Sequence, residues 1–222
     1  MYQRWIFRLT LAFALVLALG FPPGRARAQT KQDPQGPVFL VATPDLIDPV
    51  FEQSVVLMLP AQKGDLIIAG LIVNKPTKIG LHEIFPKIGV LKNSTDTAYL
   101  GGPVDIDAPS LVFRARHASS AATELFGGIY ASLDPDFVVR TLEGTQPEPE
   151  MRLYLGRSQW APEQLYGEIQ EGSWYIVPAD PAVVFSAQPG QVWHSLVEHA
   201  QLQQVSWFAP GSDWLAVQAL SH

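Results

Sequence analysis

The amino-acid sequence predicts a single α+β domain, and three observations support this expectation. Short apolar runs bounded by proline, glycine or polar residues recur along the chain and have the length of buried strands. Helical patterns are fewer, and several begin with a proline in the first turn. The chain has 222 residues, 47% of them hydrophobic and 16% charged, which is enough to fold around one core.

The apolar runs predict the strands in chain order. Proline closes the earliest ones, and the polar residues 61–65 have the composition of a hairpin loop. We expect strands at residues 38–42, 54–59, 66–73, 98–100, 111–113, 128–132, 151–155 and 174–177. Asn74-Lys75-Pro76 is expected to break the third strand, and residues 117–124 are expected to form an exposed loop.

Capping residues and apolar spacing predict the helices. Asp134 has the character of an N-cap followed by proline at the first helical position, and Asp180-Pro181 repeats this pattern. Leu165 and Ile169 lie four residues apart and would share one helix face. The predicted helices are residues 80–85, 134–143, 161–171, 180–185 and 191–201, and an aromatic tail at 205–220 forms a final strand or packs as a tail.

The first 28 residues have the three-part layout of a secretory signal peptide. Arg4 and Arg8 precede 13 uncharged residues, and Ala26-Arg27-Ala28 offers small residues for cleavage. A membrane span needs about 20 apolar residues, so this run is short for one. We expect a signal peptide at 1–28, a flexible leader at 29–37 and a domain at 38–222, in a periplasmic or secreted protein. The alternative is an anchor in the inner membrane through residues 5–21, and membrane contact is expected only through this segment if it remains uncleaved.

Composition excludes some classes of function and disfavours another. The chain has no cysteine, which rules out disulfides, thiolate catalysis and cysteine metal sites. The formal charge is −6, and removal of the four arginines in residues 1–28 leaves 11 basic residues against 21 acidic ones, a net charge of −10. Nucleic-acid phosphates require a basic face, so nucleic acid is an unfavoured partner.

A double-glycine turn at Gly101-Gly102 is the local feature around which we expect the sheet to be organised. Apolar segments lie on both sides of it, and Pro103 stiffens its exit. Paired glycines beside a strand most often serve a backbone with positive φ, so we expect positive φ at one of the two.

Catalytic and metal motifs are weak. Residues 156–160, Gly-Arg-Ser-Gln-Trp, resemble a nucleophile elbow only faintly, because Trp160 stands where that motif needs glycine; a strand-to-helix turn with a packing tryptophan is the favoured interpretation. His194 and His199 are five residues apart and face different directions on a helix, and Asp105 with Asp107 fits a solvated turn. No phosphate-loop or dinucleotide glycine pattern is present. We therefore expect no catalytic residue, metal or cofactor.

Loop ends that follow buried strands predict one kind of candidate site, a binding groove. Such ends can converge in space and bind a ligand. The alternative is that these residues serve only the turns that the fold requires. The groove candidates are Asn74, Lys75, Gly101, Gly102, Arg114 and Trp160.

Six segments in order resemble the AlgH/YqgE family (UPF0301), whose members have no established function. They are Leu40-Val41-Ala42-Thr43-Pro44, Asp48-Pro49-Val50-Phe51, Gly70-Leu71-Ile72-Val73-Asn74-Lys75-Pro76, Leu100-Gly101-Gly102-Pro103-Val104, Trp160-Ala161-Pro162-Glu163-Gln164-Leu165 and Val177-Pro178-Ala179-Asp180-Pro181. The match is strongest over residues 39–185. The resemblance implies one α+β domain of bent, coiled, mostly antiparallel β-sheets with peripheral helices. This chain departs from the family in its signal peptide, its aromatic tail and residues 156–160.

These observations favour a non-enzymatic, exported interaction or regulatory domain of this family, with a protein as its partner. One alternative is a hydrolase acting at the loop-end groove. The other is a transcriptional regulator, a label that some relatives carry, although export and acidity argue against it here.

Overall fold

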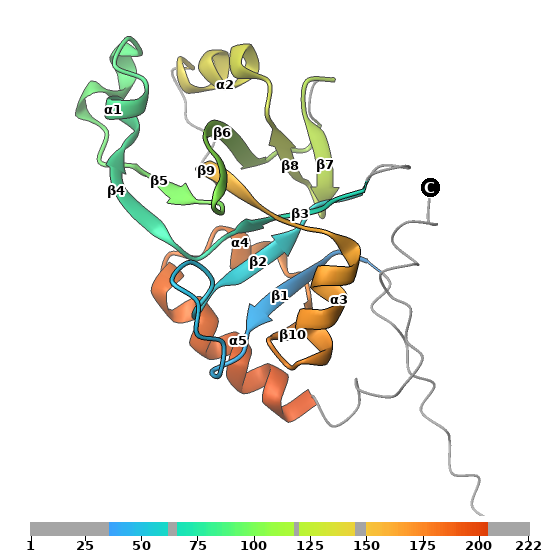
Figure 1. Cartoon of the computed structure of the whole chain (residues 1–222). Helices are drawn as coiled ribbons and strands as arrows, with labels where there is room; N and C mark the ends of the chain where they lie inside the picture. The colour runs from blue at the N-terminus through green and yellow to red at the C-terminus, as the bar shows by residue number, and fades with distance from the viewer. Residues whose placement is uncertain (1–35, 62–65, 118–119, 145–149, 204–222) are drawn as a thin grey trace, which may run out of the picture. The chain divides into compact units, whose positions relative to one another are not determined.

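The computed structural model describes residues 36–61, 66–117, 120–144 and 150–203, all of which belong to one compact unit of the chain (Figure 1). The predicted signal peptide, most of the predicted leader and the aromatic tail lie outside the described residues. The elements are β1 (Val38–Ala42), β2 (Val55–Met58), β3 (Ile68–Ile72), β4 (Pro76–Gly80), α1 (Leu81–Ile84), the 3-10 helix η1 (Gly89–Asn93), β5 (Thr97–Leu100), β6 (Val104–Arg114), β7 (Thr123–Phe126), β8 (Ile129–Ser132), α2 (Pro135–Leu142), β9 (Met151–Trp160), α3 (Pro162–Gln170), β10 (Trp174–Pro178), α4 (Pro181–Val184) and α5 (Pro189–Gln203).

The strands form one curled, mostly antiparallel sheet system centred on β9. The order is β10-β1-β2-β3-β9-β6-β8-β7, and the hairpin β4–β5 joins this path through a parallel pairing of β5 with β9. The last three residues of β9 pair with β3, while Met151–Leu155 pairs with β6. Strand β9 therefore divides the domain into two halves. We call β10, β1, β2, β3 and residues 158–160 the core half, and β4 to β8 with residues 151–155 the arm half.

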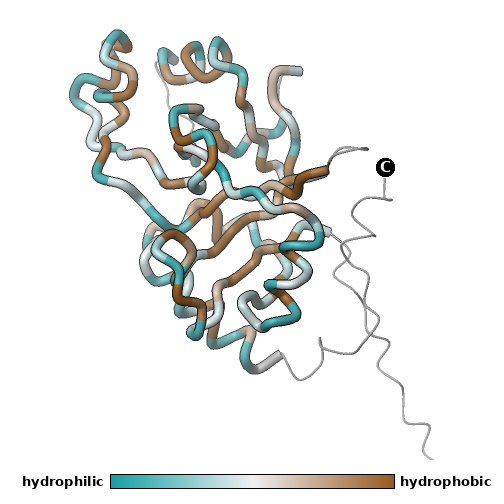
Figure 2. Tube along the Cα trace, in the orientation of Figure 1, coloured by the Kyte–Doolittle hydropathy of each residue, from teal (hydrophilic) through white to brown (hydrophobic). Residues whose placement is uncertain are grey.

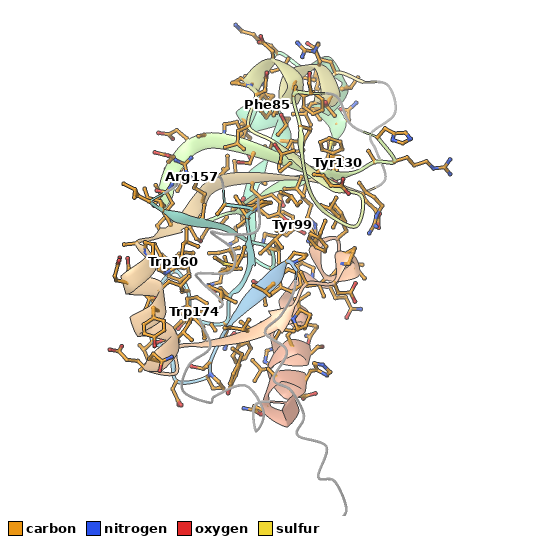
Figure 3. The ribbon with its side chains drawn as sticks, turned by 90° about the vertical axis from the view of Figure 1, so that its right-hand side faces the viewer. Phe85, Tyr99, Tyr130, Arg157, Trp160 and Trp174 are labelled. Atoms are coloured by element: carbon orange, nitrogen blue, oxygen red, sulfur yellow. The ribbon has the colours of Figure 1, made fainter. Side chains whose placement is uncertain are left out.

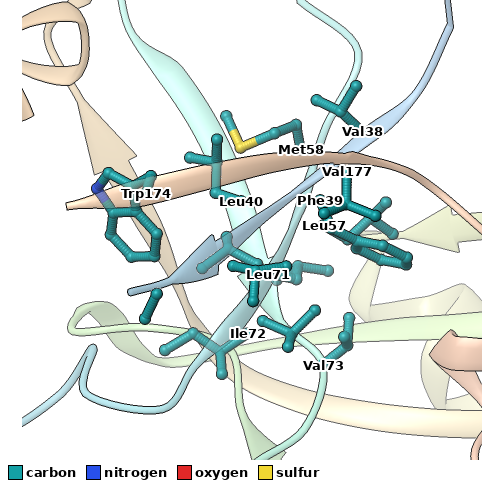
Figure 4. Close-up of a cluster of buried hydrophobic side chains, with 14 of the residues drawn as sticks. Val38, Phe39, Leu40, Leu57, Met58, Leu71, Ile72, Val73, Trp174 and Val177 are labelled. Atoms are coloured by element: carbon teal, nitrogen blue, oxygen red, sulfur yellow. The ribbon is translucent and has the colours of Figure 1, made fainter. Parts of the chain in front are cut away.

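The core half is built from strands that are buried along their whole length. Every residue of β1 and β2 is buried, and because neighbouring side chains point to opposite faces of a strand, both faces must be covered. Figure 2 shows these strands as apolar segments, and Figure 4 shows Phe39, Leu57 and Leu71 packed among them. Helix α5 packs against β1 and β10, and its Trp193 indole donates to the Ala42 carbonyl at 2.7 Å.

Glycines hold the two halves together at the middle of β9. A Cβ at Gly101 would lie 2.2 Å from the Gly156 carbonyl oxygen, and one at Gly102 would lie 2.3 Å from the carbonyl carbon of Arg157. Gly156 has φ +69° and Gly102 has φ +153°, so the expected positive φ in the Gly-Gly turn is confirmed. Only glycine allows the two backbones to approach this closely. We call Gly101, Gly102 and Gly156 the glycine clasp.

The arm half contains a second, smaller hydrophobic core. Two groups of elements project from the sheet in this half (Figure 1). We call β4, α1, η1 and β5 the first arm, and β6, β7, β8 and α2 the second arm. Helix α2 begins where the sequence predicts, since the Asp134 carboxylate accepts from the Phe137 amide at 2.9 Å. Val138 and Leu142 of α2 are buried with Leu153 of β9.

Three sequence expectations were wrong, whereas the expected break after the third strand is confirmed, because β3 ends at Ile72 and β4 begins at Pro76. Strand β7 occupies the end of the expected loop at 117–124, and β6 begins seven residues before the predicted strand at 111–113. Residues 156–160 continue β9 and form no turn. In each case pairing with a neighbouring strand creates a strand that local hydrophobicity does not indicate.

Candidate functional site

A cavity of about 420 Å³ lies between the two arms, at the start of β9. We call it the inter-arm cavity. Its lining combines apolar side chains with polar and charged ones, and comprises Leu81, Thr95, Asp96, Thr97, Tyr99, Leu111, Leu142, Met151, Arg152 and Leu153. A second hollow of about 430 Å³, between α4 and α5, has no charged side chain in its lining. The inter-arm cavity is therefore the better equipped of the two for specific recognition.

The inter-arm cavity opens where β5 and β9 cease to pair. Their parallel register consists of Tyr99↔Tyr154 and Leu100↔Leu155, and the residues before these pairs on both strands line the cavity. Residues 151–153 pair with β6 on one side only; on the cavity side, no strand of the described residues pairs with them. This edge of β9 is a place where an added extended segment could pair.

Arg152, which lines the cavity, is held in a fixed position. Its guanidinium donates to the carbonyl oxygens of Val73, at 3.3 Å, and of Val184 and Ser186. It also lies 4.4 Å from the centre of the Tyr99 ring, within the range of a cation–π contact. These contacts link the start of β9 to the end of β3 and to α4.

The polar surroundings of Arg152 include a second aromatic residue. Tyr154 is fully buried, its ring lies 5.6 Å from that of Tyr99, and its hydroxyl makes no regular hydrogen bond with a described residue. Burial raises the pKa of Tyr154, and the positive charge of nearby Arg152 works in the opposite direction. The tyrosine therefore remains neutral at physiological pH.

Asn74 and Lys75, two of the predicted groove residues, hold a loop in place. Asn74 accepts from the Val55 amide at 2.8 Å and donates to the Gln53 carbonyl at 2.9 Å. The Lys75 ammonium donates to the Val50 carbonyl at 2.7 Å. Burial lowers the pKa of Lys75, and the nearby carboxylates of Glu52 and Asp48 partly oppose this shift.

The structure brings four of the six predicted groove residues together and separates the other two. The Lys75 carbonyl accepts from the Leu100 amide at 2.9 Å, which places Asn74 and Lys75 beside the Gly101-Gly102 turn. Arg114 and Trp160 instead lie near opposite ends of β9, because Arg114 pairs with Glu150 and Trp160 is the last residue of the strand. At about 3.3 Å per residue, the strand between them is up to about 30 Å long.

Trp160 is 2% exposed and belongs to the core half. Its indole and that of Trp174 donate to the same oxygen of Glu168, at 3.0 and 2.8 Å. Figure 3 shows Trp160 and Trp174 side by side, apart from Tyr99. The Phe51 ring lies 5.5 Å from the Trp160 ring, so the tryptophan packs beneath the loop that Lys75 holds.

Ser158, the residue at the nucleophile position of the faint elbow motif, is fully buried inside β9. Its hydroxyl donates to the Gly101 carbonyl at 3.2 Å and so supports the glycine clasp. Among the described residues, no three acidic or histidine side chains gather as a metal ion would require. No helix in the described part of the chain is both long and apolar enough to cross a bilayer.

The sequence analysis did not identify Arg152 or the inter-arm cavity as a candidate site. One signal was present, because an arginine between Met151 and Leu153 interrupts an apolar run that predicts a buried strand. A charged side chain in such a position needs partners. The carbonyl groups that hold Arg152 are 32 to 79 residues away in the chain, so the sequence does not reveal them.

The curled antiparallel sheet with a few helices, a half-barrel, defines a class of fold that solved structures share. The solution structure of the AlgH protein from Pseudomonas aeruginosa aligns with a TM-score of 0.60 and 24% identity, covering 82% of this chain and 98% of that one. The crystal structure of protein DIP2367 from Corynebacterium diphtheriae gives a TM-score of 0.61 and 23% identity, with coverage of 82% and 96%.

A family model described as AlgH-like, DUF179, matches residues 39–204, and the chain belongs to this family. A UPF0301 protein of Chromobacterium violaceum is 32% identical over 151 residues, which are 66% of this chain and 80% of the relative. A UPF0301 protein of Methylococcus capsulatus is 31% identical over 167 residues, with coverage of 74% and 90%. These names state no biochemical activity.

Proposed function

We propose that this AlgH-like protein is an exported, non-enzymatic interaction domain that binds an extended segment of a partner protein in the inter-arm cavity. The observation that carries this proposal is the edge of β9 at residues 151–153, which faces the cavity and pairs with no strand of the described residues there. Backbone amide and carbonyl groups at such an edge require partners, and a peptide strand supplies them in register.

The walls of the cavity suit the side chains of such a segment. Leu81 comes from α1 in the first arm, and Leu111 and Leu142 come from β6 and α2 in the second, so a bound segment would lie between the two arms. Burial of apolar side chains would supply affinity, while backbone pairing would supply orientation.

Substitution at the cavity rim tests this binding role. Thr95 is exposed and lines the cavity, so Thr95→Trp should obstruct the entrance without disturbing the core. Thr123→Trp, on the exposed start of β7 and outside the lining, is the matched control. Affinity capture from the periplasm should recover the same partner with wild type and Thr123→Trp, and lose it with Thr95→Trp. Equal recovery with all three proteins would show that the cavity is not the binding site.

Export is tested separately at the N-terminus. The charge pattern and the small residues Ala26 and Ala28 support cleavage after Ala28, so we expect N-terminal sequencing of the native protein to begin at Gln29. Recovery of the full-length chain from the cytosol would contradict export while leaving the binding role open to the capture experiment.

A further inference from the structure

The chemistry around Arg152 identifies the kind of segment that the inter-arm cavity accepts. We propose that the bound partner segment carries a carboxylate and that Arg152 receives it, with apolar side chains of the segment against the leucine walls. This inference rests on the proposed binding function and specifies its ligand.

The first argument is that Arg152 is already positioned for a ligand. Three backbone carbonyls and the Tyr99 ring fix its side chain, so little conformational entropy remains to be lost on binding. These contacts use three of the five guanidinium N–H groups, and the other two are not taken up by backbone carbonyls of the described residues. A planar carboxylate matches this arrangement of donors.

The second argument is that the charge of Arg152 is not neutralised by the described residues. Carbonyl groups accept hydrogen bonds but carry no net charge, and no carboxylate of the described residues lies within ion-pair distance of Arg152. Two other arginines behave differently: Arg114 pairs with Glu150, and Arg157 pairs with Asp105. A half-buried cation without a counter-charge is unfavourable, and a carboxylate ligand would supply the missing charge.

The third argument concerns the orientation of the bound segment in the cavity. Asp96 is the acidic residue of the cavity lining, and with Thr95 it lies directly before β5, which begins at Thr97. A ligand carboxylate is repelled there and attracted to Arg152 at the start of β9. The two charges therefore orient the segment, because its anionic group must lie on the β9 side of the cavity.

The carboxylate could be the C-terminus of the partner or an aspartate or glutamate side chain. Three short peptides separate these sources: acetyl-Leu-Leu with a free carboxylate, the same peptide as its amide, and acetyl-Asp-Leu amide. Each is titrated into the exported protein, and the NMR signals of the Arg152 Nε–H group and of the Leu81, Leu142 and Leu153 methyl groups are followed.

We expect the free acid to bind at least about tenfold more tightly than the amide, because a charge-assisted hydrogen bond is lost in the amide. Tight binding of acetyl-Asp-Leu amide would identify a side-chain carboxylate as sufficient, whereas binding of the free acid alone would identify the C-terminus. Equal binding of acid and amide in the cavity would overturn the carboxylate inference and leave the proposed function intact. Absence of shifts with all three peptides would overturn the inference, and the Thr95→Trp capture experiment then decides the proposed function independently.

Variants provide a second readout. Arg152→Gln removes the charge, but it also removes bonds that link β9 to α4, so it is interpreted only if its thermal melt remains cooperative. Asp96→Asn avoids this difficulty because Asp96 is exposed and asparagine can still accept from the Ser94 hydroxyl. It should raise the ratio of acid to amide affinity by about twofold or more, since a repelling charge is removed. A lower ratio in Asp96→Asn would contradict the proposed orientation.

Discussion

The core half and the arm half are both built from strands, but they bury those strands differently. All nine residues of β1 and β2 are buried, whereas β4 and the start of β7 are mostly exposed. Apolar burial is the main source of stability, so the core half is the scaffold of the domain. The arm half contributes the exposed edges, the inter-arm cavity and Arg152. Under the proposed function, stability and recognition belong to different ends of one strand, β9.

The largest expected effect is at the glycine clasp, where the two halves meet. In Gly102→Ala, the new methyl group would overlap the Arg157 backbone at a site with φ +153°. We expect the free energy of unfolding to fall by roughly 3 kcal/mol or more, from steric overlap and backbone strain. Urea denaturation measures the change.

Gly190→Ala is the matched control, because a Cβ at Gly190 in α5 meets nothing within 4 Å. Its stability should be unchanged or slightly raised. Equal stability of the two variants would mean that the halves are not joined through close backbone contact.

The second prediction compares one strand from each half. Leu57 in β2 is fully buried, and Leu57→Ala should lower the free energy of unfolding by about 2–5 kcal/mol. Ile79 in β4 is 42% exposed, and Ile79→Ala should change it by less than about 0.5 kcal/mol. If chemical denaturation shows similar losses in the free energy of unfolding for both variants, the division into a scaffold and an arm is contradicted.

The third prediction concerns the loop beside the clasp. Asn74→Ala would leave the buried Val55 amide and the Gln53 carbonyl without their partner, at a cost of about 1–3 kcal/mol. Asn93→Ala, at the exposed end of η1, is the control and should be nearly neutral. A neutral Asn74→Ala in thermal denaturation would show that the loop does not depend on this side chain.

The smallest expected effect is the pH dependence at Lys75. Its pKa in the folded state lies below the reference value of 10.5, so between these two values the unfolded chain binds more protons. This group's contribution to stability therefore rises with pH through that window. In Lys75→Gln the contribution is absent, and the stability of wild type relative to the variant should increase as pH approaches 10.5. If the stability of wild type relative to Lys75→Gln falls as pH rises, the prediction is wrong.

The sequence predicts the core half well because local signals determine it. The run Val38–Ala42 is apolar throughout and forms a strand with both faces covered, as expected. The Asp134 and Asp180 caps begin helices at their predicted positions because the capping bond is made within two or three residues. The N-terminal segment and the aromatic tail lie outside the described residues, so expectations for them remain predictions.

The arm half is harder to predict because its strands depend on distant partners. Thr77 and Lys78 have no strand-like hydrophobic pattern, yet β4 forms because its hairpin partner β5 lies beside it. The candidate site depends still more on remote contacts, since Arg152 is held by groups far away in the chain. The sequence predicted Asn74 and Lys75 as groove residues. The structure shows that both side chains form hydrogen bonds with the backbone of a loop.

Native-state hydrogen exchange, resolved residue by residue, tests the division between scaffold and arms most directly. We predict that the amides of β1, β2 and β3 exchange only through global unfolding, while those of β4 and β7 exchange at least about 100-fold faster through local opening. Equal protection in both halves, or slower exchange in β4 and β7 than in β1 and β2, would contradict the account.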